Sequence, residues 1–283
     1  MLRQRVFRGS WAVEQGLLTR AQLRSSAWRR LRSDVYADAD QPDTHRLHAR
    51  GVSLVMPRSA ALGGVTAAVL WGIADAATAA DPVEVVVPPG VRWDPQPGIV
   101  VRTAALGDGV VRSGSWLRWT SGVRTAVDLA RRGPVEDAVV LVDRLVRVGA
   151  AVLPEVRTAV AALPRCRGSR LAREVASLAD GLAESPQETR VRLLLGRAGL
   201  PAPVAQYVVR DGGRFVARVD FGWPRQRLAL EYDGLWHGEP GQFSRDRERL
   251  NRLTAAGWRV VFVTAADLRQ PDLLLARLRA QLS

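Results

Sequence analysis

The chain has 283 residues, of which 47% are hydrophobic and 24% are charged, and it carries a formal net charge of +13. No apolar run approaches the ~20 residues that span a bilayer, and the single cysteine, Cys166, excludes an internal disulfide. The basic N-terminus has no apolar core behind it, so we expect no signal peptide and a cytoplasmic protein of about two domains. All 41 basic residues are arginines. Because arginine binds phosphate well, we expect a nucleic-acid partner and no membrane partner.

The first three segments are predicted to form a mainly helical front. Residues 1–55 are expected to hold two short helices, WAVEQG and TRAQL, the second capped by Thr19, before a strand in WRRLRSDVYA. Residues 56–112 are expected to form a small α/β region, with a helix in RSAALGGVTAAVLWGI followed by the extended runs DPVEVVVPPG and GIVVRTAAL. Residues 113–183 are expected to be a helical connector, in which one helix closes at Gly133 and the next begins at Pro134.

Residues 184–283 give the clearest order of elements. Ser185 is expected to cap a helix that has Pro186 in its first turn and Glu188 three residues after the cap. AQYVVRDGGRFVARVDFGW predicts a hairpin, and the remaining elements are a strand in RLALEYDG, a helix in SRDRERLNRLTAAG, a strand in WRVVFVT and a helix in PDLLLARLRAQL. A helix crosses over between the last two strands, which predicts that these two are parallel.

Acidic residues gather where the third of these strands ends. Glu231 and Asp233 share one strand face, and a symmetric GWPRQ loop would put Asp220 opposite Glu231. Side chains paired in this way are ~4.5–5.5 Å apart at Cβ, so the carboxylates would repel each other without compensation. A bound Mg²⁺ or Mn²⁺ ion would compensate the negative charges, because Mg²⁺ binds carboxylate oxygens. Alternatively the register differs, or the neighbouring Arg218 and Arg227 neutralise the acids.

Three further polar residues are candidates with two interpretations each. Glu188 takes part in catalysis or only completes the helix cap. Gln206, on the strand that pairs with the Asp220 strand, orients a water or phosphate or is an ordinary surface glutamine. His237 follows the acids within GLWHG, and it transfers a proton, contacts phosphate or simply packs.

The stretches RVDFGW, LALEYDGLWHG and RDRERLNRLTAAGWRVVFVT resemble the endonuclease domain related to very-short-patch-repair (Vsr-like) nucleases of the PD-(D/E)xK superfamily. The resemblance covers about the last hundred residues. It implies a restriction-endonuclease-like α-β-β-β-α-β core that cleaves phosphodiesters, with Asp220 and Glu231 as metal ligands. We expect the main-chain carbonyl of Tyr232 as a third ligand.

Other positions follow from the same resemblance. Asp233 stands where many members have a lysine, which leaves the general base unassigned because this chain has no lysine. His237 matches a histidine near the site in the Vsr-like branch. Asp246 and Arg247 match an acidic–basic pair on the following helix, which would brace the site.

The stretches GLLTRAQL, WRRLRSDVYA and RSAALGGVTAAVLWGI resemble the winged-helix domain of AbiEi-type antitoxins. In that family a recognition helix separates the first two pieces, whereas here only RSS stands between them. The resemblance therefore implies a degenerate winged helix that does not read the major groove in the usual way.

These patterns favour a Mg²⁺-dependent endonuclease, and we expect its substrate to be DNA rather than RNA. Arg218, Arg245 and Arg249 would neutralise backbone phosphates, in contacts that weaken with salt. The alternative is a non-catalytic DNA-binding regulator, similar to an antitoxin, that keeps the nuclease fold as a phosphate-binding scaffold. The three acids favour the enzyme, and the missing lysine favours the regulator.

Overall fold

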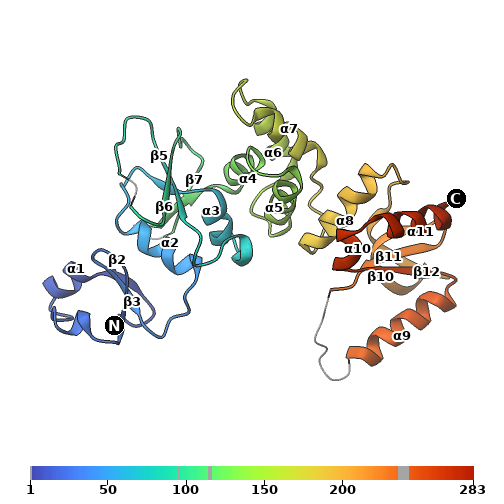
Figure 1. The fold of residues 1–283 in the computed structure, drawn as a ribbon, viewed down its shortest axis with the longest axis horizontal. Coiled ribbons are helices and arrows are strands. Elements are labelled where there is room, and N and C mark those ends of the chain that lie inside the picture. The colour runs from blue at the N-terminus through green and yellow to red at the C-terminus, as the bar shows by residue number, and fades with distance from the viewer. Residues whose placement is uncertain (1, 95, 114–116, 235–241) are drawn as a thin grey trace. The chain divides into compact units, whose positions relative to one another are not determined.

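The computed structural model describes residues 2–94, 96–113, 117–234 and 242–283, without the side chains of residues 112, 113 and 242–246. The chain divides into two units, Met1–Ser177 and Leu178–Ser283. Both units contain helices and sheets, which confirms the mixed α/β class (Figure 1). Within the described residues, no helix combines the length and the apolar character that crossing a membrane requires.

The first unit begins with a small antiparallel sheet in the order β1-β3-β2, formed by β1 (Val6–Arg8), β2 (Trp28–Arg32) and β3 (Val35–Asp38). It is accompanied by α1 (Gly9–Glu14) and by a single 3₁₀ turn, η1 (Gln22–Arg24). The predicted cap forms, because the Gln22 N–H donates to Thr19 Oγ1 at 3.2 Å. The helix predicted after it, however, extends no further than the 3₁₀ turn.

A five-stranded sheet follows in the order β6-β5-β4-β8-β7. Its strands are β4 (Ala61–Leu62), β5 (Val83–Val87), β6 (Ile99–Thr103), β7 (Val110–Ser113) and β8 (Leu117–Thr120). It is joined by α2 (His45–Ser53), α3 (Gly64–Leu70) and the 3₁₀ turn η2 (Ala74–Ala76). Ala49 and Val52 of α2 share a core with Leu62, Val83 and Val85.

The front contains more sheet than predicted: within its described residues, eight strands form two sheets beside the helices. The single helix predicted in RSAALGGVTAAVLWGI is wrong. Gly63 is extended and Gly64 has a φ of +52°, so the chain changes direction and only the part from Gly64 onward is helical. The preceding Ala61–Leu62 pairs with β5 and β8 instead.

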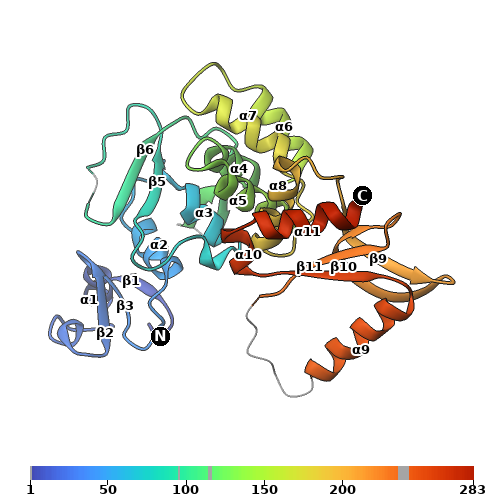
Figure 2. The same cartoon turned by 45° about the vertical axis from the view of Figure 1, so that its right-hand side comes forward.

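Four helices complete the first unit: α4 (Gly122–Ala130), α5 (Val135–Arg147), α6 (Leu153–Ala161) and α7 (Ser169–Leu178). They lie next to one another in two views (Figures 1 and 2). Gly133 follows α4 with a φ of +73°, and Pro134 is the N-cap of α5, close to the predicted boundaries.

The second unit follows the predicted order of elements. It contains α8 (Pro186–Arg197), β9 (Val204–Asp211), β10 (Arg214–Trp223), β11 (Leu228–Tyr232), α9 (Gln242–Ala255), β12 (Arg259–Val263), α10 (Ala265–Arg269) and α11 (Asp272–Leu282). The strand order is β12-β11-β10-β9, and β11 and β12 are parallel, as the crossover predicted. Only the short α10 was not expected.

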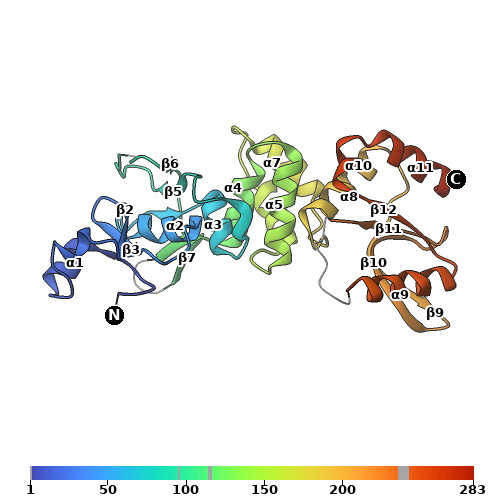
Figure 3. The ribbon, with the colours of Figure 1, turned by 60° about the horizontal axis from the view of Figure 1, so that its bottom comes forward.

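Helices cover both faces of this sheet (Figure 3). Leu228 and Leu230 pack in a core with Leu274 and Leu278 of α11, whereas Ala229 packs with Leu253 of α9 on the other face. Because side chains alternate along a strand, the next residue with the orientation of Ala229 is Glu231. The fold therefore turns a carboxylate at the end of β11 towards α9.

Candidate functional site

The site begins where the pairing of β10 with β11 ends. The pairs are Phe221↔Leu230, Gly222↔Ala229 and Trp223↔Leu228, which is the register predicted from a symmetric loop. One further step would place Asp220 opposite Glu231. Instead, Asp220 Oδ2 accepts a hydrogen bond from the Tyr232 N–H at 2.8 Å. The carboxylate thus takes the place of a β10 main-chain acceptor, and it lies against the end of β11.

Among the described acids of this region, Asp220 has the most strongly shifted pKa. Burial raises its pKa to about 6; the Tyr232 N–H and Arg249 oppose the increase, whereas Glu188 and Glu184 add to it. A carboxyl group with this pKa changes its protonation state near neutral pH, and a nearby cation stabilises its ionised form. Perturbed groups of this kind are concentrated at functional sites.

Glu188 is buried at the N-terminus of α8. Its N–H donates to Ser185 Oγ at 3.2 Å, so the predicted cap is present. The carboxylate does not return to Ser185, however: its Oε2 accepts from the Glu184 N–H at 2.9 Å and from Gln206 Nε2 at 2.8 Å. Glu188 therefore joins the start of α8 to β9, while its charge acts on Asp220.

Gln206 lies at an irregular point of β9. The pairs Ala205↔Phe221 and Tyr207↔Val219 flank it, so it stands across from Asp220. Its φ of 51° is uncommon for a residue other than glycine. The backbone thus departs from regular strand geometry at the position opposite Asp220, and the Gln206 amide donates to Glu188.

Glu231 is only 6% exposed, and Arg249 of α9 neutralises it. Arg249 Nη1 donates to Glu231 Oε1 at 2.6 Å, and Nη2 donates to Oε2. Arg249 Nη1 also donates to the Arg218 carbonyl at 3.2 Å. Arg249 was not one of the two arginines, Arg218 and Arg227, that were considered from the sequence as neutralising these acids. Arg218 instead forms an ion pair with Glu184 at 2.7 Å.

The remaining candidate residues have other positions. Asp233 is exposed past the end of β11, and its N–H donates to the Val263 carbonyl at 2.8 Å. His237 and the side chains of Arg245 and Asp246 lie outside the described residues, and Arg247 is exposed on α9. Within the described part of the chain, no three histidine, cysteine or acidic side chains are grouped so that they could hold a metal ion.

The donor atoms at the site suit a hard cation. Asp220 and Glu231 offer carboxylate oxygens, Tyr232 adds a main-chain carbonyl at the same strand end, and Mg²⁺ is commonly bound by one or two carboxylates with several waters. The expected third carboxylate, Asp233, does not complete a group of three here. Arg249 already balances Glu231, so an ion bound by both carboxylates needs this ion pair to open.

Two of these features were not predicted from the sequence. Glu184 was not considered, and Arg249 was assigned to phosphate rather than to Glu231. The sequence gives one indication: Arg249 follows Arg245 by four residues, so both lie on one face of α9. If that face covers the acids, Arg249 comes close to them. Which face this is depends on how α9 packs.

No protein-family model matches the chain. The uncharacterized Mycobacterium tuberculosis proteins Rv2248 (strain H37Rv) and MT2308 (strain CDC 1551) are each 36% identical to it over 257 residues, which is 88% of this chain and 90% of each relative. The crystal structure of the M. tuberculosis protein RV2827C aligns with a TM-score of 0.40 and 13% identity, over 74% of this chain and 84% of that one. The sequence alignment with the two relatives is longer than either unit, so it includes parts of both.

Proposed function

The chain belongs to the same family as the M. tuberculosis protein Rv2248, and we propose that its second unit is a Mg²⁺- or Mn²⁺-dependent endonuclease. The proposed substrate is nucleic acid, and we favour DNA over RNA. One observation carries the proposal: the half-buried Asp220, whose pKa is raised to about 6, is bonded to the end of β11 next to the buried Glu231.

The arrangement of elements supports a restriction-endonuclease-like core of the Vsr-like type. The order α8–β9–β10–β11–α9–β12, with β11 and β12 parallel, is the order expected for such a core. Its acids lie on two adjacent central strands, Asp220 within β10 and Glu231 near the end of β11.

In this proposal, Asp220, Glu231 and the Tyr232 carbonyl hold the metal ion. When bound, the ion lowers the pKa of a water and balances charge that develops on the phosphate. Asp220 would hold the ion as the ionised carboxylate, and Glu231 would hold it only if the Arg249–Glu231 ion pair opened. Arg249 is then available to a backbone phosphate, which guanidinium groups bind through two parallel hydrogen bonds.

The neighbouring residues position these groups. Glu188 and Gln206 hold the start of α8 against β9, and the Glu188 charge raises the proton affinity of Asp220. Arg218, exposed beside Glu184, provides a second contact for phosphate. His237 remains the proposed proton donor or phosphate contact, and Arg245 a third phosphate contact.

A second candidate is a non-catalytic nucleic-acid-binding protein. The Arg249–Glu231 pair favours it, because a guanidinium already compensates the buried carboxylate. In that case the fold would serve as a phosphate-binding scaffold, and the degenerate winged helix of the first unit would add further affinity.

Incubation of the purified chain with supercoiled plasmid and with RNA, in Mg²⁺, in Mn²⁺ and in chelator, tests the proposal. Metal-dependent nicking or cleavage is expected, and Asp220→Asn and Glu231→Gln should abolish it. Glu248→Gln, which changes an exposed acid next to Arg249, is the matched control and should leave cleavage intact. Absence of cleavage with every substrate and metal, together with retained binding, would favour the second candidate.

A further inference from the structure

Half of the described residues that line a cleft in the first unit are arginines. The cleft has a volume of about 640 Å³, within the range of ligand sites. Five of its ten lining residues are Arg102, Arg124, Arg131, Arg132 and Arg167, and the others are Val86, Val101, Thr103, Ala104 and Asp128. The positive charges come from β6, from α4 and the residues after it, and from the segment before α7. Like charges this close repel one another, so a bound anion would stabilise the cleft.

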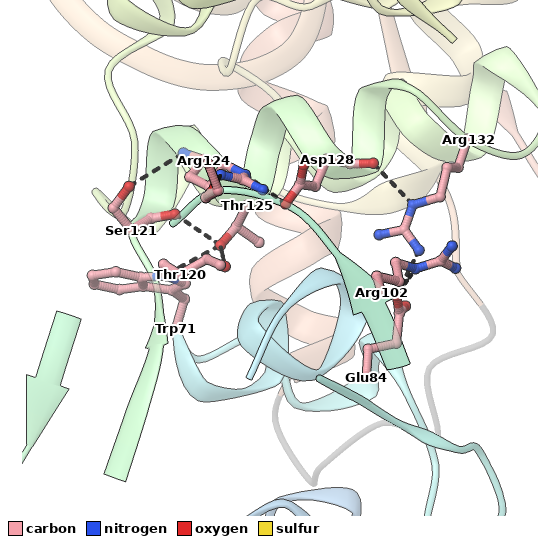
Figure 4. A network of polar contacts seen from close by, with 10 residues as sticks. Trp71, Glu84, Arg102, Thr120, Ser121, Arg124, Thr125, Asp128 and Arg132 are labelled. Atoms are coloured by element: carbon pink, nitrogen blue, oxygen red, sulfur yellow. Dashed lines mark hydrogen bonds and ion pairs between the residues drawn. The ribbon is translucent and has the colours of Figure 1, made fainter. Parts of the chain in front are cut away.

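Glu84 of β5 holds two of the guanidinium groups in place, those of Arg102 and Arg132 (Figure 4). Arg102 Nε and Arg132 Nη1 both donate to Glu84 Oε2, at 2.8 and 2.5 Å. Burial by itself would raise the pKa of Glu84, but the bonds from these two arginines hold it below its usual value. Glu84 is therefore ionised, and it anchors one wall of the cleft.

Asp128 of α4 holds two of the arginines, Arg124 and Arg132. Arg124 Nε donates to Asp128 Oδ2 at 2.8 Å, and Arg124 Nη1 donates to the Ala105 carbonyl at 2.7 Å. Arg132 Nε donates to the Asp128 carbonyl at 3.0 Å. Each guanidinium has five N–H donors, so these anchors use only some of them. The five arginines also outnumber the two carboxylates, which leaves the cleft positively charged.

The geometry points to a phosphate-binding site, and we propose that this cleft binds the phosphodiester backbone of a nucleic-acid duplex. Fixed guanidinium groups suit phosphate oxygens, because little side-chain entropy is lost when they bind. Among the described residues that line the cleft, none is aromatic. A single strand or a free nucleotide is usually held by stacking of its bases on aromatic rings, whereas a duplex backbone needs only charge and donors.

This inference rests on the proposed function only in taking nucleic acid as the partner. It adds a second contact surface, in the unit that lacks the acidic site. Binding through this cleft would therefore contribute affinity without sequence preference, whether or not the second unit cleaves the strand.

The test is a salt titration of a fluorescein-labelled DNA duplex by anisotropy, in chelator, with the Asp220→Asn protein as background. Arg102→Gln with Arg167→Gln removes two cleft charges, while Arg132 stays on Glu84. Arg92→Gln with Arg170→Gln removes two exposed charges outside the lining of the cleft, and is the matched control. Arg167→Gln alone, at an exposed position, is the milder variant if the double variant unfolds early.

The cleft variant is expected to bind about tenfold more weakly at roughly 0.1 M salt. Its slope of log affinity against log salt should become less negative by about 1.8, at ~0.9 per phosphate, whereas the control stays near the background protein. Equal losses in both double variants would show that only net charge matters, and would overturn the proposal. It would also be overturned if the cleft variant lost binding of a nucleoside triphosphate but kept its duplex affinity. Plasmid cleavage is measured separately, so a failure of the nuclease proposal leaves this result unaffected.

Discussion

Arg249 of α9 binds both carboxylate oxygens of Glu231 in β11, and its guanidinium balances the buried negative charge near the end of that strand. Glu231 is buried, whereas the Arg249 side chain is one-third exposed. An incoming phosphate or metal ion can therefore compete for either member of the pair.

Replacement of Arg249 by glutamine should expose the dependence of Glu231 on its partner. Without metal, we expect a loss of about 2–4 kcal/mol in the free energy of unfolding, because the buried Glu231 carboxylate loses its guanidinium partner. Millimolar Mn²⁺ should restore more of that loss in the variant than it adds to the wild type, by ligand linkage. Denaturant unfolding with and without Mn²⁺ measures both effects.

Arg252→Gln, an exposed change on the same helix, is the control and should alter stability by less than about 0.5 kcal/mol. If Mn²⁺ stabilises neither the wild type nor Arg249→Gln, the carboxylates do not form a metal site.

The raised pKa of Asp220 predicts a pH-dependent effect of Asp220→Asn. The folded protein keeps this proton up to a pH of about 6, whereas an unfolded aspartate loses it near 3.9. Ionisation of Asp220 therefore costs stability as the pH rises from about 4 to about 6. The variant should be more stable than the wild type by about 1–3 kcal/mol at pH 7.5, with little difference at pH 4. An amide oxygen can still accept from the Tyr232 N–H, so a loss of stability at both pH values would contradict this account.

Glu188 should influence Asp220 through charge. Glu188→Gln keeps an acceptor for Gln206 and for the Glu184 N–H, but it removes one of the causes that raise the Asp220 pKa. We expect the Asp220 pKa to fall by a fraction of a unit, measured by NMR titration of the labelled aspartate carboxyl carbons. An unchanged pKa with lower stability would indicate that Glu188 acts only as a helix cap.

The first 55 residues should not select a defined DNA sequence. Between α1 and β2 the structure has one 3₁₀ turn of three residues, which is too short to lie along a major groove as a recognition helix does. Selection from random duplexes with the Asp220→Asn protein should return no strong motif. Recovery of a short palindrome would show that this region reads bases.

The local sequence pattern was sufficient to predict most of the helices and strands of the second unit. Glycines and prolines placed the turns, alternation placed the strands, and the loop between Trp223 and Leu228 set the register that brings Asp220 towards Glu231. These features depend on residues close together in the chain, so the sequence determines them. The same approach failed in the first unit, where RSAALGGVTAAVLWGI has helical composition but Ala61–Leu62 pairs with distant strands.

Only the tertiary structure decided which charges meet. Arg249 lies 18 residues from Glu231, and Arg132 lies 48 residues from Glu84. The sequence determines that Arg124 and Asp128 share a helix face, because four residues make about one turn. It does not determine which strand packs beneath that face. Any of several arginines could pair with a given carboxylate, and only the packing of the elements decides which one does. An ion pair forms where burial makes an uncompensated carboxylate costly, and burial is a property of the whole fold.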